Sequence, residues 1–184
     1  CAECGHVDGQ SYNSCRNRHC PKCQSLAQLR WVEQRMTRML PTHAFHVVFT
    51  LPRQLRRLVL ANRARVFHLL FASAATTLLE FGRDPNRLGA DLGVTSVLHT
   101  WTRDLRFHPH VHCIVTGGGL SLDAQRWVDT RVHYLFPVRA LGELFRGKLL
   151  DALRRAHDGG LLRFDGPAAS FQDRQRFRQL CDRL

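Results

Sequence analysis

Three histidines stand at every second position in the stretch HPHVHCIV, residues 108–115. Alternate side chains of an extended strand point to the same face, so His108, His110 and His112 would share one face of a sheet. Two imidazoles at this spacing lie about 7 Å apart along a strand and can converge on one ion. Pro109 cannot donate a ladder hydrogen bond, so it marks a strand start or an edge and separates His108 from the pair. The spacing therefore makes His110 and His112 candidate ligands of one ion.

A second group of potential metal ligands lies at the start of the chain, where five of the seven cysteines fall within 23 residues. Cys1 and Cys4 form one C-x2-C pair, and Cys20 and Cys23 form another after fifteen intervening residues. This spacing is typical of a four-thiolate zinc site, and such a site is structural because it leaves no position for a water. Crowding of this kind favours metal binding in a reducing compartment over a disulfide framework. Alternative zinc ligands at this end of the chain are Cys15 and His19.

The charge of the chain points to a polyanionic partner. Among its 184 residues, 27 Lys and Arg stand against 15 Asp and Glu, which gives a net charge of +12, and only Lys22 and Lys148 are lysines. Arginine suits bidentate contacts to phosphate, so the composition predicts binding to nucleic acid, with a merely solvated basic surface as the alternative. Basic residues in and after the cysteine-rich segment are predicted to contact DNA: Arg16, Arg18, Lys22, Arg30 and Arg35.

Hydrophobic patterning excludes two broad classes of protein. A hydrophobic content of 44% is too high for a wholly disordered chain. No apolar run approaches the roughly 18 residues of a membrane span, and no signal peptide is visible, so we expect no membrane partner and a cytoplasmic, nucleoid-associated protein of bacterial type. Because the chain begins at Cys1 without an initiator Met, we expect a fragment.

The order of the predicted elements favours an α+β fold, an antiparallel sheet flanked by helices. Residues 1–40 are expected to form a zinc-binding module with a basic linker helix, and residues 41–184 a second domain. Gly117, Gly118 and Gly119 are expected to close the last long strand. The periodicity predicts helices over 25–40, 52–82, 141–156 and 171–184, a loop over 82–93, and strands over 44–51, 93–101, 109–120 and the short pair 126–130 and 134–138.

Four blocks together resemble the HUH nuclease superfamily and, within it, rolling-circle insertion-sequence transposases that carry an N-terminal zinc-binding region. The blocks are SYNSCRNRHCPKCQ, FHVVFTLP, SVLHTWTRDLRFHPHVHCIVTGGGL and LFPVRAL. The resemblance implies an HUH-nuclease-like fold and metal-dependent nicking and strand transfer of DNA that is single-stranded or forms hairpin transposon ends. It also implies that His110 and His112 bind Mg²⁺ or Mn²⁺, alongside structural Zn²⁺ in the N-terminal module, and that Arg103 and Arg106 contact phosphates.

The resemblance further implies a tyrosine nucleophile that forms a phosphotyrosine link, on a helix downstream of the histidines. The chain has only Tyr12 and Tyr134, and neither matches that position. We therefore expect the catalytic tyrosine after Leu184, a catalytic domain that is incomplete at its C-terminus, and a fragment that binds DNA without cleaving it. Tyr134 as a substitute nucleophile is the weaker interpretation.

Two questions stay open from the sequence. The third ligand of the catalytic ion could be His99, Asp104 or His108, or could come from outside the chain. The function could also be that of a zinc-ribbon nucleic-acid-binding protein without catalysis, or of a histidine-rich metal hydrolase unrelated to transposition.

Overall fold

Two units make up the chain, Cys1–Pro41 and Thr42–Leu184, and each is described here by itself. The computed structural model describes residue 20 and residues 23–184, and the predictions that fall on residues 1–19 and 21–22 lie outside the described residues.

The first unit contains α1 (Ser25–Met36), which is four residues shorter than predicted at its C-terminal end. The backbone N–H of Thr37 still bonds to the carbonyls of Glu33 and Arg35, and the Thr37 hydroxyl donates to the carbonyl of Gln34. The apolar residues at helical spacing are exposed, as are most residues of α1.

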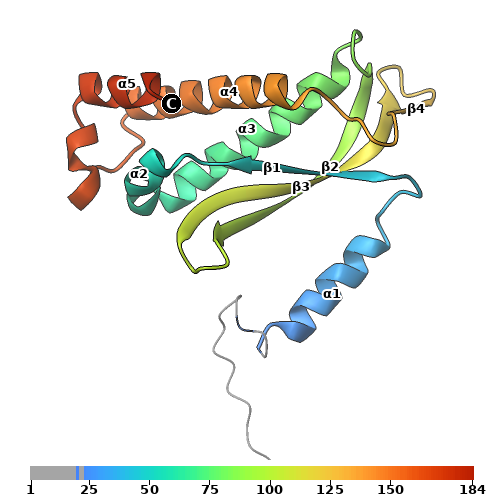
Figure 1. The fold of residues 1–184 in the computed structure, drawn as a ribbon, viewed down its shortest axis with the longest axis horizontal. Coiled ribbons are helices and arrows are strands. Elements are labelled where there is room, and N and C mark those ends of the chain that lie inside the picture. The colour runs from blue at the N-terminus through green and yellow to red at the C-terminus, as the bar shows by residue number, and fades with distance from the viewer. Residues whose placement is uncertain (1–19, 21–22) are drawn as a thin grey trace, which may run out of the picture. The chain divides into compact units, whose positions relative to one another are not determined.

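A four-stranded antiparallel sheet organises the second unit (Figure 1). β3 lies in the middle, with β1 on one side and β2 on the other, and the short β4 pairs with the far end of β3. β2 and β3 form a hairpin with its turn at residues 102–106. The strands are β1 (Ala44–Thr50), β2 (Ala90–Trp101), β3 (Phe107–Ser121) and β4 (Trp127–Asp129).

One face of this sheet is covered by helices, and the opposite face carries the histidines. Phe49 of β1 packs its ring 4.7 Å from the ring of Phe145 in α4, and α3 and α4 lie on the same side of the sheet in Figure 1. The residues of β3 on that side, Val111, Cys113 and Val115, are completely buried. Because side chains alternate along a strand, His110 and His112 point to the opposite face.

The helices follow the strands in the predicted order, which confirms the α+β fold. α3 is long and apolar enough to cross a membrane by length and composition, which the sequence analysis did not anticipate. One stripe of α3, including Val66, Leu70 and Leu78, is nevertheless completely buried in the core that it forms with α4 and the sheet. The helices are η1 (Arg53–Leu55), α2 (Arg56–Ala61), α3 (Arg63–Arg83), α4 (Val138–Asp158), η2 (Gly166–Phe171) and α5 (Arg174–Asp182).

The single helix predicted over residues 52–82 is wrong in one respect, because Asn62 interrupts it. The Asn62 amide nitrogen donates to the carbonyls of Leu58 and Arg163, at 3.0 and 2.8 Å. Its amide oxygen accepts from the backbone N–H of Arg163 at 2.6 Å. A buried amide that bonds backbone groups in this way competes with helical hydrogen bonds and joins the break to a distant segment.

Three further predictions differ from the structure. β2 starts at Ala90, inside the predicted loop. Residues 134–138 form no strand, and only an isolated bridge joins Tyr134 to Arg131. Gly117, Gly118 and Gly119 lie inside β3 rather than at its end. Each of the three is packed so closely that an added Cβ would come within 3.0 Å of a neighbour: His43, Val128 or Asp91.

Pro109 also lies inside β3, at its third residue, whereas the sequence placed it at a strand start or an edge. The ladder tolerates it because the pairing of β2 with β3 is irregular between His99 and Trp101, next to Pro109. Its carbonyl still accepts a hydrogen bond from the N–H of Leu51 at 3.1 Å.

Candidate metal centre

Three histidines converge on the open face of the sheet. His99 of β2 pairs directly with His110 of β3, and His112 follows two residues later on the same face. The potential ligand nitrogens of these three side chains all lie within 4.8 Å of one another. Cross-strand pairing and the two-residue repeat together bring imidazoles from two strands to one point. We call His99, His110 and His112 the histidine triad.

Of the candidates for the third ligand, His99 is the one whose ring nitrogen the structure brings within 4.8 Å of those of His110 and His112. Asp104 lies in the exposed hairpin turn, 4.0 Å from Arg106. His108 instead uses its backbone: its carbonyl accepts a hydrogen bond from Nδ1 of His110 at 2.6 Å. Since a carbonyl can only accept, His110 carries its proton on Nδ1 and keeps the lone pair of Nε2 for an ion.

The state of His112 also suits an ion. Its Nε2 is buried and has no hydrogen-bond partner in the structure. Burial lowers the pKa of His112, and the nearby His99, His110 and His46 lower it further. His112 is therefore neutral at pH 7, the form that binds metals. A buried nitrogen without a partner is costly unless an ion or a proton acceptor uses it, so these residues fit a divalent cation.

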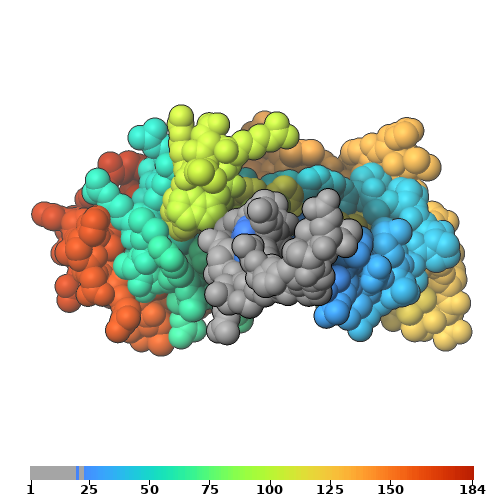
Figure 2. Space-filling view, turned by 90° about the horizontal axis from the view of Figure 1, so that it is seen from below, coloured from blue at the N-terminus to red at the C-terminus, as the bar shows by residue number. Residues whose placement is uncertain are grey.

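Three arginines lie in the hairpin turn or near His108: Arg103, Arg106 and Arg56. Arg103 and Arg106, which the sequence proposed as phosphate contacts, are exposed in the hairpin turn, drawn in lime in Figure 2. Burial lowers the pKa of His108, and the nearby His110 and then Arg56 of α2 lower it further. The Nε of Arg56 is buried without a hydrogen-bond partner. Sequence reasoning missed Arg56, since nothing distinguishes it from the other arginines.

Residues 93–184, half of the chain, match the family model described as "Putative transposase". The chain belongs to this transposase family. Residues 1–51 of the transposase match a second family model, described as "Transposase zinc-binding domain". The resemblance drawn from the cysteine-rich and histidine-containing blocks is thereby confirmed.

Two curated relatives are similar to the transposase over much of its length. "Putative transposase y4qJ" from Sinorhizobium fredii is 45% identical over 179 residues, 97% of this chain and 45% of that protein. "Transposase for insertion sequence element IS801" from Pseudomonas savastanoi pv. phaseolicola is 38% identical over 130 residues, 71% of this chain and 30% of that protein. The chain thus spans less than half the length of the curated relatives it matches.

Among solved structures, the transposase is similar to the conjugative relaxase TrwC in complex with oriT DNA, in a metal-bound structure. The identity is 17% and the TM-score is 0.47, over 60% of this chain and 42% of the relaxase chain.

Only part of the predicted zinc site can be described. The backbone N–H of Cys23 donates to the sulfur of Cys20 at 3.4 Å, so the Cys20 sulfur lies against the backbone of the second cysteine of this pair. Arg30 and Arg35 lie on α1 of the same unit, where the Arg35 guanidinium lies 5.7 Å from the centre of the Trp31 ring. The other predicted residues of this module lie outside the described residues: Cys1, Cys4, Cys15, Arg16, Arg18, His19 and Lys22.

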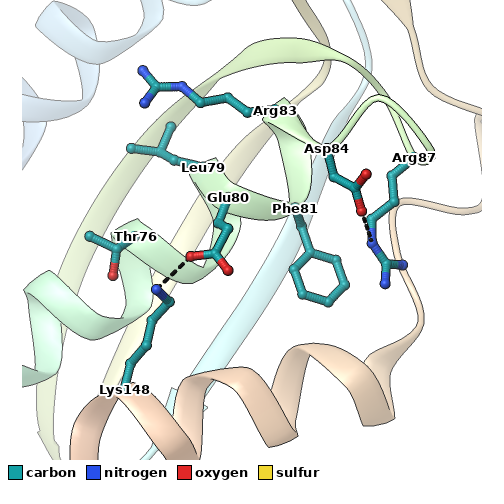
Figure 3. A pocket seen from close by; sticks show the side chains of 8 residues that line it. All are labelled: Thr76, Leu79, Glu80, Phe81, Arg83, Asp84, Arg87 and Lys148. Carbon is teal, nitrogen blue, oxygen red and sulfur yellow. Dashed lines mark hydrogen bonds and ion pairs between the residues drawn. The ribbon is translucent and has the colours of Figure 1, made fainter. Parts of the chain in front are cut away.

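The linings of two hollows in the second unit include no member of the triad. One, of about 680 Å³, opens between the end of α3 and α4 (Figure 3). Its charges pair with one another: Lys148 with Glu80 at 2.6 Å and Arg87 with Asp84 at 3.0 Å. The other, of about 510 Å³, lies along β1 and is lined by His46 and by Tyr134, which is 50% exposed.

Proposed function

We propose that this chain forms the metal-binding and DNA-binding part of a rolling-circle-type transposase. In this proposal the protein nicks single-stranded DNA at the transposon ends and transfers the strand through a phosphotyrosine intermediate. The observation that carries the proposal is the histidine triad: three imidazoles from two strands meet on the open face of the sheet, with the buried Nε2 of His112 lacking a partner. Membership of the transposase family supports it.

The triad would hold the ion, and the arginines would hold the DNA backbone. A bound divalent ion supplies a Lewis acid that stabilises charge on the scissile phosphate. Three imidazoles favour a transition-metal ion such as Mn²⁺ over Mg²⁺, which prefers oxygen ligands. In this proposal Arg103 and Arg106 in the hairpin turn, and Arg56 near His108, would contact phosphates of the bound DNA.

The nucleophile in this proposal is a tyrosine hydroxyl outside residues 1–184. Its oxygen bonds to the scissile phosphorus as the bond to the 3′ oxygen breaks, which leaves a 5′-phosphotyrosine and a free 3′-OH. Tyr134 is the one tyrosine among the described residues. It lies in the turn before α4, where its backbone N–H donates to the carbonyl of Arg131. We assign it no part in the reaction.

The partner in this proposal is DNA in the cytoplasm, associated with the nucleoid. A net charge of +12 favours binding to any nucleic acid, and the names of both curated relatives favour DNA. The zinc-binding domain would add a second DNA contact through its basic residues and α1.

A strand-cleavage assay tests the proposal. A chimera is made in which this chain replaces the matching region of the Sinorhizobium relative, so that the relative supplies the rest of the protein. The chimera is incubated with Mn²⁺ and end-labelled single-stranded DNA from the transposon ends. We expect nicking and a covalent protein–DNA species on a denaturing gel. His110→Ala and His112→Ala should abolish both, while His68→Ala, on the exposed side of α3, should not.

Three results would contradict the proposal. Cleavage that survives both histidine substitutions would remove the metal role. Cleavage without a covalent species would favour a metal hydrolase. DNA binding without any cleavage would favour a zinc-ribbon binding protein.

A further inference from the structure

His46 of β1 lies directly beside the triad and no part of the proposed reaction uses it. Its Nε2 is 2.7 Å from Nδ1 of His112. The two ring centres are 4.9 Å apart and the ring planes are nearly parallel, at 9°. In parallel rings whose facing nitrogens are 2.7 Å apart, centres this far apart require an edge-to-edge arrangement, because in a stack with nitrogens this close the centres would be closer together. The contact is therefore an in-plane hydrogen bond rather than a stack.

The register of the sheet explains why the two side chains meet. His46 pairs with Ile114 and Val48 pairs with His112, so His46 and His112 are diagonal neighbours on the open face. Diagonal neighbours are within reach of ring side chains. His46 thus approaches His112 from the strand opposite to the one that carries His99.

Only one proton can lie between the two nitrogens. Which of the two histidines donates it determines whether Nε2 of His112 is free to bind an ion. If His112 donates from Nδ1, its buried Nε2 keeps a lone pair for an ion. If His46 donates instead, Nε2 of a neutral His112 carries a proton, and that buried N–H has no acceptor. The first arrangement is the one that can bind an ion.

We propose that His46 is a positioning residue that accepts the Nδ1 proton of His112 and so fixes His112 in its metal-binding tautomer and orientation. This inference rests on the proposed metal centre. The two β3 ligands are then oriented by different devices: His110 by the backbone carbonyl of His108 and His112 by a side chain. Only the hydrogen bond from His112 to the His46 side chain can be removed by a substitution of its acceptor.

The test compares two replacements of His46 in the whole, zinc-loaded chain. His46→Phe keeps a flat ring and removes the acceptor, whereas His46→Gln places an amide oxygen where it can accept from His112. The probe is Mn²⁺, with affinity measured by electron paramagnetic resonance of the free ion. Nitrogen-15 chemical shifts of the histidine rings, measured without the ion, report the tautomer. His68→Phe is the matched control, on α3.

We expect His46→Phe to weaken Mn²⁺ binding by about 10- to 100-fold and to mix the tautomers of His112, as loss of such an outer partner does elsewhere. His46→Gln should restore most of both, and His68→Phe should change neither. Unchanged Mn²⁺ affinity in His46→Phe overturns the inference. The inference is also wrong if His46→Gln binds Mn²⁺ as weakly as His46→Phe while its melting temperature equals that of the unsubstituted chain. Nitrogen couplings that show His46 itself bound to Mn²⁺ would also overturn it.

Failure of this inference can be told from failure of the proposed function. If His110→Ala leaves Mn²⁺ affinity unchanged, the metal centre itself is wrong. If Mn²⁺ affinity depends on the triad and on His46 but the chimera of the strand-cleavage assay does not nick DNA, the inference about His46 holds and the proposed reaction is wrong.

Discussion

At the scale of residues, two members of the triad have neighbours that act on their ring protons. The carbonyl of His108 accepts a hydrogen bond from Nδ1 of His110. Burial lowers the pKa of His112, and the neighbouring imidazoles lower it further. The sequence predicts His110 and His112 from their H-x-H spacing together with the family resemblance of the blocks around them. It leaves His99 open, because only the pairing of β2 with β3 decides which residue lies opposite His110. His46 could have been found, since the alternation of FHVVFTL puts it on the face opposite Phe45 and Val47.

A pair of substitutions separates His99 from His108 as the third ligand. We expect His99→Ala to weaken Mn²⁺ binding by more than about a hundredfold, because a ligand should count for more than its outer partners. His108→Ala keeps the carbonyl that orients His110, so its effect should stay below about tenfold. Isothermal titration of the zinc-loaded chain with Mn²⁺ measures both. The reverse order of effects would assign the third ligand to His108.

At the scale of elements, close packing around β3 holds the triad in place. The sequence predicts most strands and helices because their apolar periodicity is strong. The sequence prediction fails at residues 117–119, where a run of three glycines is typical of a turn. In the structure these glycines lie inside β3, where neighbouring residues approach too closely for a Cβ. The prediction also fails at Asn62, whose partner Arg163 is 101 residues away in sequence. In both places the deciding contact is non-local.

Two glycine substitutions test the packing of β3. A Cβ on Gly119 would fall within 3.0 Å of the backbone carbonyl of Asp91 in the neighbouring strand, which cannot move without disturbing the ladder. Gly119→Ala should therefore destabilise the second unit by about 1–3 kcal/mol. The control is Gly142→Ala on α4, where nothing lies within 4 Å and helix propensity should stabilise by about 0.5–1 kcal/mol. Urea unfolding followed by circular dichroism measures both, and equal stabilities would contradict the packing described for β3.

At the scale of the whole molecule, charge and fold serve different purposes. A net positive charge of this size favours binding to nucleic acid of any sequence, and the sheet brings three histidines together at one place. The sequence indicates the charge fully, since it needs only counting. It indicates the zinc-binding and transposase regions through long motifs, and family membership bears out both. The positions of Arg56 and His46 beside the histidines depend on the folded sheet and helix.

Salt dependence tests which arginines meet the phosphate backbone. We expect affinity for single-stranded DNA to fall steeply between low and moderate salt, since bound phosphates release counterions. Replacing Arg103 and Arg106 together by Gln should weaken binding and reduce the slope of log K against log salt by about 1–2. Replacing Arg139 and Arg155, which pair with Glu143 and Asp151 on α4, is the matched control and should change the slope less. Fluorescence anisotropy with a labelled oligonucleotide measures the slope, and an equal effect of the two pairs would argue for diffuse attraction only.

The most direct test of the central claim is anomalous diffraction from crystals of the chain grown with Mn²⁺. The account predicts an anomalous peak among the ring nitrogens of His99, His110 and His112, absent from crystals of His112→Ala. Manganese peaks found only at other sites, with the three imidazoles unbound, would contradict it.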